Sequence, residues 1–582
     1  MTASSQAIWR SIEEIDSYKK ADKMRTIVPD KFGLYEINYT QMVKHLSKAS
    51  NENIEKTNLK TVEFSLPLPE GGMISMTFVE SPNMSPVLSS KFPDIKSYRG
   101  YNPNNPSEHA RIDFGPMGFH AAIVTRKGTV YIDPYYTFPD DMCMSYYVKD
   151  HHVDQSQYVN GCGYNHYNDE IKKEEALYVN PSNTSTPKKS MPVIKRTYRM
   201  ALACTGRWGS IWGTPENVMS RFNTGVNRFN IIFENEVGIH FELIDDNDKL
   251  IFFTDADPYS EPSLGRVTLG ENTSVINNEV GSGSYDIGHV FTTFCTDGVA
   301  GIAFGGSVCR GNKGGGVSCV GTSDVSNFII QTGAHEVGHQ FSGGHSWDNC
   351  PGNETQRAAE VAFEPGSGST ILSYSGLCGS NNVQGPNDDY FHVGNINQFY
   401  DFVEASSCGL IEVSDNNSPD LFVDIPEGLT IPISTPFELD GRAVDPDGDM
   451  MTYNWEQMNR NSIPSQLGSP TLNAPSFRSF PPGTNTKRTF PRIGNILAGI
   501  GNPREVLPTY SRDLNFRFTV RDNHPGVGVT VWEEVEFKAS DTAGPFVITN
   551  PRQITFVEVN ESLSVEWDVA NTDNDIINCQ TV

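Results

Sequence analysis

The sequence predicts a multidomain protein with a central α/β domain, an α+β region before it and all-β sandwich domains after it. Its 582 residues are enough for about three to five domains. Strand and helix patterns alternate between residues 193 and 412, which is typical of an α/β domain. After about residue 418 the helical patterns end, and runs of alternating apolar and polar residues predict strands.

The N-terminal region, residues 1–179, begins with a Lys- and Glu-rich part that predicts helical stretches. Strands follow, because residues 61–66 and 73–79 alternate apolar and polar side chains. We therefore expect an α+β region with a helical start and a β-rich remainder.

A polar stretch, residues 180–192, predicts a linker that a protease can reach. The basic pairs Lys188-Lys189 and Lys195-Arg196 lie in it or directly after it. They are candidate cleavage sites for activation, and the alternative is ordinary linker charge.

The central domain, residues 193–412, contains the clearest helix. Apolar residues recur every three or four positions over 218–233, which predicts one apolar helix face. Period-two alternation predicts a strand over 198–204, and further strands are expected at 239–244 and 250–253.

The C-terminal part predicts β structure throughout. Residues 418–541 contain two clean alternating runs, 515–520 and 529–537, and their length suits one β-sandwich. Residues 544–582 begin another β pattern but are too few for a sandwich of about 100 residues. We expect a longer natural chain to continue this domain.

Composition narrows the function classes. With 44 Lys and Arg against 71 Asp and Glu, the net charge is −27, which argues against nucleic-acid binding. The sequence contains no run of about 18 apolar residues, so it predicts no membrane-spanning helix. The ten cysteines suit disulfides of unknown pairing, and the 51 Gly and 36 Pro suit a secreted or cell-surface protein. The first 13 residues lack a signal-peptide pattern, so a cytosolic location is the alternative.

Residues 335–345 carry the chemistry, with the sequence HEVGHQFSGGH. His335 and His339 are four residues apart, so on a helix they lie on one face and can share a metal ion. Glu336 lies about 100° around the helix from His335, where it can act as a general base beside the metal.

A third imidazole, His345, follows two glycines that allow the helix to end and the chain to turn back. Three neutral imidazoles leave a fourth position open for water, as in catalytic zinc sites. The alternative is a helix with surface histidines.

This motif resembles the metzincin metallopeptidase signature, HExxHxxGxxH. Ser342 stands where the family has its turn glycine, and we expect Gly343 to make the turn instead. The resemblance implies a zinc-dependent peptidase with His335, His339 and His345 as ligands.

Residues 364–378 resemble the Met-turn of secreted bacterial reprolysin-like peptidases, with Leu372 in place of the usual Met. The swap conserves volume, so we expect the apolar floor of the site to survive. Tyr374 matches the Tyr that in some metzincins assists the metal and the developing oxyanion. Residues 388–398 resemble the closing helix region of the same family.

The flanks resemble those of the same peptidases. Residues 60–135 are similar to their N-terminal pro-region, and residues 430–456 to the cadherin- or Ig-like module that often follows. The resemblance implies a secreted zinc endopeptidase, made as a zymogen, that hydrolyses protein or peptide substrates. The alternative is a surface adhesin whose peptidase domain is weakened or inactive.

A second metal site is predicted on an acidic loop. Asp445, Asp447 and Asp449, with Glu456 at the twelfth position, match part of an EF-hand loop, but Met450 replaces its glycine. We expect a β-sandwich loop that binds Ca²⁺ through these three aspartates, and the alternative is a solvated turn.

Other candidate ligands are weaker. His151, His152 and Cys162 lie where a pro-segment could block the zinc, and a thiolate is a good zinc ligand. The sequence around Cys162 does not match a known cysteine switch, so we expect a disulfide or an ordinary buried thiol. We also expect His289 and His392 to be structural.

Overall fold

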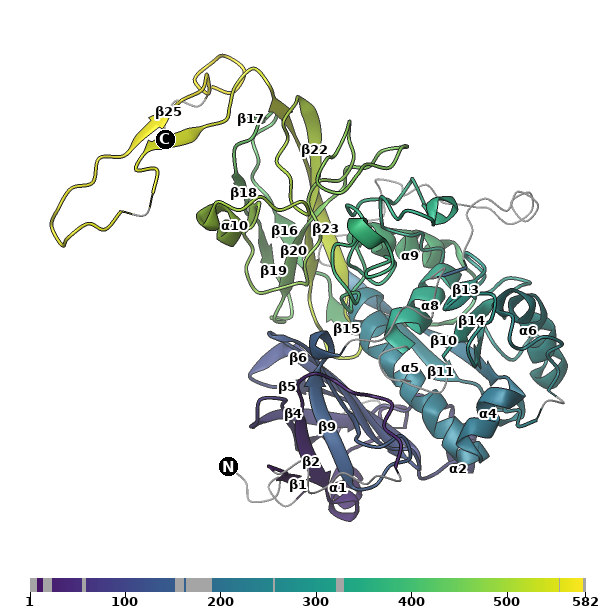
Figure 1. Ribbon diagram of the computed structural model, residues 1–582. Helices are drawn as coiled ribbons and strands as arrows, with labels where there is room; N and C mark the ends of the chain where they lie inside the picture. Colours follow the sequence, from purple (N-terminus) through teal and green to yellow (C-terminus); the bar gives the residue numbers. More distant parts are fainter. Residues whose placement is uncertain are drawn as a thin grey trace.

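The computed structural model describes most of the chain, and three structural regions follow one another along it (Figure 1). The described residues are 8–13, 23–54, 59–151, 162–163, 191–254, 257–320, 329–553 and 555–578. Residues 180–190 of the predicted linker, with the Lys188-Lys189 pair, therefore lie outside the described residues, as does His152, whereas Pro192 at the predicted end of the linker already belongs to a strand.

The N-terminal region is one antiparallel sheet of nine strands in the order β1-β2-β9-β8-β7-β6-β5-β4-β3. The strands are β1 Trp9–Ser11, β2 Gly33–Ile37, β3 Val62–Pro67, β4 Met73–Glu80, β5 Lys96–Asn102, β6 Asn105–Gly115, β7 Gly118–Thr125, β8 Gly128–Pro134 and β9 Met142–Tyr147. Two short helices accompany them, α1 (Tyr39–Leu46) and α2 (Pro86–Lys91). The predicted strands at 61–66 and 73–79 are confirmed, whereas the described part of the first 60 residues holds only the helix α1 and two strands.

The central region is built on a mixed sheet in the order β11-β10-β12-β14-β13, with β15 also paired to β10. Strands β10, β11, β12 and β14 are parallel, and β13 and β15 run antiparallel to their partners. The strands are β10 Pro192–Cys204, β11 Ile239–Leu243, β12 Ile287–Thr292, β13 Gly301–Ala303, β14 Gly316–Cys319 and β15 Leu410–Asn417. The helices are α4 Gly206–Trp212, α5 Pro215–Val237, α6 Gly265–Val280, α8 His335–Gln340 and α9 Val393–Ala405.

The prediction of a strand at 250–253 is wrong. A short 3-10 helix (η4, Asn247–Leu250) occupies its start, and only Ile251 forms a bridge, to Cys204. The cause is the buried side chain of Asn247, which accepts a hydrogen bond from the backbone N–H of Leu202 and donates one to its carbonyl. These bonds take the backbone groups of β10 that another strand would need.

Helix α5 is buried on two sides. Its predicted apolar face, with Phe222, Val226, Phe229 and Phe233, packs into the central core. Its polar face is also buried, because the N-terminal sheet covers it. There Arg111 of β6 donates hydrogen bonds of 2.6 and 2.8 Å to the carboxylate of Glu234.

The C-terminal region is almost entirely β, as predicted. Its strands are β16 Asp420–Phe422, β17 Thr430–Pro432, β18 Phe437–Leu439, β19 Arg442–Val444, β20 Thr452–Gln457, β21 Arg488–Phe490, β22 Arg512–Arg521 and β23 Thr530–Ser540, with one short helix, α10 Ile493–Ala498. The main sheet runs β17-β23-β22-β20. Stacked phenylalanines, including Phe437, Phe490 and Phe516, fill its core. We call this region, residues 418–541, the sandwich.

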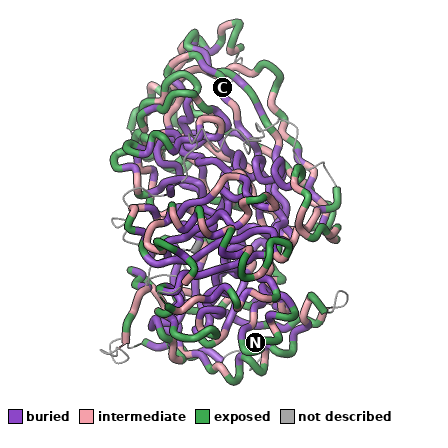
Figure 2. The backbone as a smooth tube through the Cα atoms, turned by 90° about the vertical axis from the view of Figure 1, so that its right-hand side faces the viewer, coloured by how far each residue is buried: buried purple, intermediate pink, exposed green. Residues whose placement is uncertain are grey.

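Beyond the sandwich, β24 (Val547–Asn550) pairs with β25 (Glu566–Asp568). The apolar residues Leu563, Val565 and Trp567, which alternate along the chain, are exposed there. Figure 2 shows the same trend, with buried residues through the body of the molecule and exposed residues gathered near the C-terminus.

Three disulfides cross-link the central region: Cys295–Cys319, Cys309–Cys408 and Cys350–Cys378. Cys143, Cys162 and Cys204 are buried thiols outside these disulfides. Among the described helices, none combines the length and hydropathy that a membrane span requires.

Candidate metal centre

Helix α8 presents the first two histidines. It follows a π-helical turn (η5, Ile329–Ala334), and its apolar residues Ala334, Val337 and Phe341 are completely buried in the core. This packing fixes the rotation of the helix, so that His335 and His339 point to its other side. The predicted helix and its apolar face are confirmed.

The turn after the helix differs from the prediction. Ser342, not Gly343, adopts the left-handed backbone conformation, with φ of +71°. Gly343 is needed for space, because a Cβ atom there would lie 2.5 Å from Cδ1 of Leu372 and 2.8 Å from the ring of Phe399. The two positions therefore divide the roles that one turn glycine would have.

The three imidazoles converge on one point. The Nε2 atoms of His335 and His339 are 3.1 Å apart, those of His339 and His345 3.2 Å, and those of His335 and His345 3.3 Å. All three side chains are buried. The predicted convergence of His345 with the helical pair is thus present.

Backbone carbonyls fix the tautomer of each ring. The Nδ1 atoms lie 2.6–2.7 Å from carbonyl oxygens: His335 from Ile371, His339 from Gly343, and His345 from Gln356. A carbonyl only accepts, so Nδ1 carries the proton and donates it. Each neutral ring then directs an Nε2 lone pair at the same space.

This arrangement fits a zinc ion. Tetrahedral zinc with Zn–N bonds of about 2.0–2.1 Å separates its ligand atoms by about 3.3 Å, which matches the observed triangle. Three lone pairs facing one another repel, and a cation between them removes that repulsion. Metal-bound histidines normally donate their other ring N–H to a carbonyl or carboxylate, and each of these three rings donates Nδ1–H to a backbone carbonyl.

Glu336 lies beside the triangle and is completely buried. Its Oε1 has no hydrogen-bond partner, and its Oε2 lies 3.4 Å from the sulfur of Cys162. Burial raises the pKa of Glu336 well above its usual value. Gly301 of β13 makes room for this carboxylate, since a Cβ atom there would lie 2.5 Å from Oε1.

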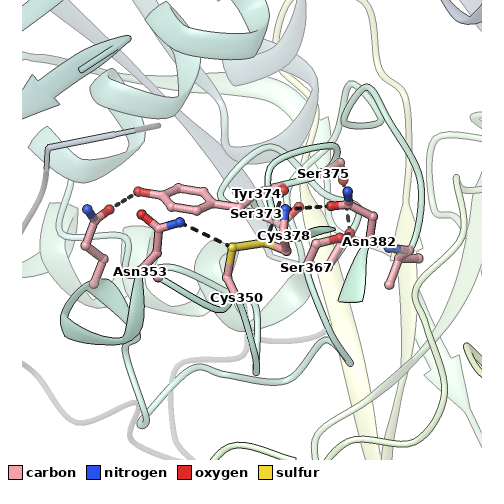
Figure 3. The surroundings of a disulfide bond; sticks show 12 residues. Cys350, Asn353, Ser367, Ser373, Tyr374, Ser375, Cys378 and Asn382 are labelled. Carbon is pink, nitrogen blue, oxygen red and sulfur yellow. Dashed lines mark hydrogen bonds between the residues drawn. A yellow bond between two sulfur atoms is a disulfide. The ribbon is translucent and has the colours of Figure 1, made fainter. Parts of the chain in front are cut away.

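The floor and one wall come from the turn at 371–374. Leu372 is buried against Gly338 and Gly343, so it fills the predicted place of the methionine. Tyr374 places its ring 4.7 Å from that of His345, and its hydroxyl, which has one proton to donate, lies between two acceptors: the carbonyl of Cys162, at 3.0 Å, and the side-chain oxygen of Gln356. Figure 3 shows Tyr374 beside the Cys350–Cys378 disulfide that closes this turn.

Cys162 is a buried thiol outside the three disulfides, which is one of the two predicted outcomes, but its position beside the histidines was not predicted. Its Sγ and the three imidazoles form one potential ligand set, with all four ligand atoms within 4.8 Å of one another. Gly163 donates a backbone hydrogen bond of 2.8 Å to the carbonyl of Gly301, which holds the segment along β13. His151 forms a ring contact with Tyr146 in the N-terminal region and is not a member of this set.

Helix α9 clamps the glycine pair that precedes His345. Gln398 accepts a hydrogen bond of 2.9 Å from Gly344 N–H, and Asn395 donates one of 2.8 Å to its carbonyl. Within the region predicted to resemble the closing helix, residues 388–398, the helix begins at Val393. It holds the residue before the third ligand through the two hydrogen bonds to Gly344.

The other predicted histidines are structural. His289 contacts Gln340 and Ser318 through its two ring nitrogens, at 3.1 and 2.9 Å. His392 caps helix α9 by accepting a hydrogen bond from Gly394 N–H.

The acidic loop brings Asp445, Asp447 and Asp449 together, with one oxygen of each within 4.8 Å of the others. Asp445 accepts hydrogen bonds from the backbone N–H groups of Asp447 and Asp449. His524 contacts Asp449 at 2.8 Å. The cluster thus forms a hydrogen-bonded turn, and calcium binding stays a prediction.

The chain also holds a cavity of about 460 Å³ between the N-terminal sheet, α5 and the sandwich. Asp388 and Asp389 line it, and burial raises the pKa of Asp389 to about 7. None of the three zinc-site histidines lines this cavity. Cys162 and Tyr374 lie beside them instead, in one buried cluster with Trp347.

A sequence model of the reprolysin-like metallopeptidase family M12B matches residues 194–401. These residues therefore form a reprolysin-like metallopeptidase domain, and peptidases of this family depend on zinc. No curated protein matches the chain.

We expect opposite effects from two neighbouring substitutions in the turn. Ser342→Gly should stabilise the protein by up to about 1 kcal/mol, because glycine adopts positive φ without steric cost. Gly343→Ala should destabilise it by about 1–3 kcal/mol, because the new methyl group overlaps Leu372. Urea denaturation of the zinc-loaded proteins measures both, and a stabilising Gly343→Ala would show that the turn is assigned to the wrong residue.

Proposed function

We propose that this protein is a zinc-dependent endopeptidase that cleaves protein or peptide substrates. The observation that carries the proposal is the convergence of three neutral imidazoles beside a buried carboxylate, Glu336, with an unpartnered oxygen. A purely structural zinc site needs no base beside its ligands.

In the proposed mechanism, His335, His339 and His345 hold the ion. Zinc supplies a Lewis acid that lowers the pKa of water at the open position. Glu336 accepts the proton of the attacking water and returns it to the leaving amine as the peptide bond breaks. The ring of Tyr374 lies 4.7 Å from that of His345, and its hydroxyl would donate a hydrogen bond to the developing oxyanion.

The edge strand β13 is suited to bind the substrate backbone. It is the last strand of its sheet, so one row of its backbone groups is open to another strand. The carbonyl of Gly301 already accepts a hydrogen bond from Gly163. An extended substrate segment would use the same groups by strand addition.

We further propose that the intact chain is a latent precursor. The sulfur of Cys162 lies within 4.8 Å of a nitrogen of each of the three imidazoles, and its backbone carbonyl accepts a hydrogen bond from the hydroxyl of Tyr374. A thiolate there would displace the water that the reaction needs.

The contact with the N-terminal sheet is consistent with its removal. The polar part of the contact between this sheet and α5 includes Thr224 bonded to Asp113 at 2.6 Å and Arg228 paired with Asp133 at 3.2 Å. These groups can be hydrated once the sheet leaves.

Secretion is the proposed location. It is supported by the three disulfides, since such bonds persist mainly in oxidising compartments.

Replacing the proposed base should separate metal binding from catalysis. Glu336→Gln should keep zinc, because the carboxylate is not a ligand, and lose about 10²–10⁴-fold in cleavage rate. Zinc content and cleavage of an unfolded protein are measured after identical limited trypsin treatment, with His335→Ala as the control that loses both. Cleavage at the wild-type rate would rule out Glu336 as the base.

Removing the blocking thiol should activate the intact chain. Cys162→Ala should raise the cleavage rate of the unprocessed protein by at least about tenfold, because the open position becomes available to water. Cys143→Ala is the matched control, since it removes a buried thiol from the core of the N-terminal sheet. Equal activity of Cys162→Ala and wild type, with both chains shown to be intact, would contradict latency through this residue.

A further inference from the structure

We infer that a loop of the sandwich positions the third histidine of the zinc site through Arg357, so that the sandwich is part of the metal-binding unit. The inference rests on the proposed zinc site and does not depend on peptide cleavage.

His345 is anchored differently from the other two ligands. Its Nδ1 donates to the carbonyl of Gln356, in a three-residue 3-10 turn (η6, Glu354–Gln356). The carbonyls that anchor His335 and His339 belong to Ile371 and Gly343, in the two turns that pack together around Leu372. The orientation of His345 therefore depends on how firmly the segment around Gln356 is held.

Arg357, the next residue, holds that segment from two sides. Within the peptidase domain it donates hydrogen bonds of 2.7 Å to both the carbonyl and the carboxylate of Asp348. Toward the sandwich it donates to the carbonyls of Asn461, at 2.6 Å, and Ser462, at 3.2 Å. Asp348 completes the link by accepting the backbone N–H of Ser465 at 2.8 Å.

The loop that receives these bonds is itself fixed in the sandwich. It follows β20, and Asn459 at its start accepts a hydrogen bond from Asn515 N–H and donates one to the carbonyl of Asp513, both on β22. The path from β22 to His345 thus consists of direct hydrogen bonds and neighbouring residues.

The chemistry of the link requires arginine. Four hydrogen bonds leave the planar guanidinium in different directions, and the ammonium of lysine cannot reproduce that geometry. Both charged partners are almost completely buried, so the loss of one leaves the other without compensation. Arg357 is therefore a positioning residue that acts on zinc through Gln356.

The test measures zinc affinity of the full chain by competition with a chelating dye, in a Glu336→Gln background that prevents self-cleavage. Arg357→Gln should weaken zinc binding by about 10–100-fold, as loss of outer-shell partners does elsewhere. Arg357→Lys should recover part of the affinity. With Co²⁺ in place of zinc, Arg357→Gln should also shift the visible absorption bands, because the third imidazole is displaced.

Arg488→Gln is the matched control. The side chain of Arg488 is 10% exposed and that of Arg357 6%, and each pairs with a buried carboxylate. Arg488 donates to Glu505 and to the carbonyls of Trp455 and Arg478, all within the sandwich and outside the proposed path. It should lower stability without changing zinc affinity or the cobalt spectrum. Unchanged zinc affinity in Arg357→Gln, or an equal loss in Arg488→Gln, would overturn the inference.

A second variant covers the case in which Arg357→Gln does not fold. Asn459→Ala loosens the loop from β22 without touching the peptidase domain, and it should also weaken zinc binding. Parental zinc affinity in a folded Asn459→Ala protein would contradict the proposed path. A parent chain that binds zinc tightly but cleaves no substrate after activation would contradict the proposed function and leave this inference standing.

Discussion

The structure depends on three hydrogen bonds from imidazole Nδ1–H groups to backbone carbonyls. They fix the proton of each ring on Nδ1 and orient the rings toward a common centre. The three unprotonated Nε2 atoms then lie 3.1–3.3 Å apart. In a buried site this arrangement is unfavourable without a cation. The carbonyls belong to three separate segments, at Gly343, Gln356 and Ile371, so the surrounding domain has to hold all three in place.

That requirement explains why other regions pack so closely on the peptidase domain. Helix α9 binds the backbone of Gly344, and the sandwich contacts two helices of the central region. Arg517 of β22 donates a hydrogen bond to Asn397 on α9, and Arg521 donates two hydrogen bonds of 2.8 Å to Glu236 on α5. The N-terminal sheet covers the polar face of α5. The N-terminal sheet and the sandwich thus both contact helix α5. We propose that the N-terminal sheet is removable and that the sandwich is part of the metal-binding unit.

The local patterns of the sequence were informative where spacing alone determines geometry. The i, i+4 histidines, the amphipathic helix α5, the β-rich flanks and the turn beneath the site were all predictable. The prediction of a strand at 250–253 was wrong because a distant contact decides the outcome: Asn247 binds Leu202 and suppresses the strand. The position of Cys162 was not predictable from local sequence, since its sulfur meets histidines that lie more than 170 residues away. The roles of Gly301, Gln356 and Arg357 leave no local signal, because they follow from tertiary contacts only.

Zinc K-edge X-ray absorption on the intact, unprocessed chain tests the central claim most directly, because it counts the ligands around the ion. The account predicts one zinc per chain, bound by three imidazole nitrogens at about 2.0–2.1 Å and one sulfur at about 2.3 Å. A Cys162→Ala chain should replace the sulfur by a light atom and keep the three imidazoles. Fewer than three imidazoles, or no bound zinc at all, would contradict the account.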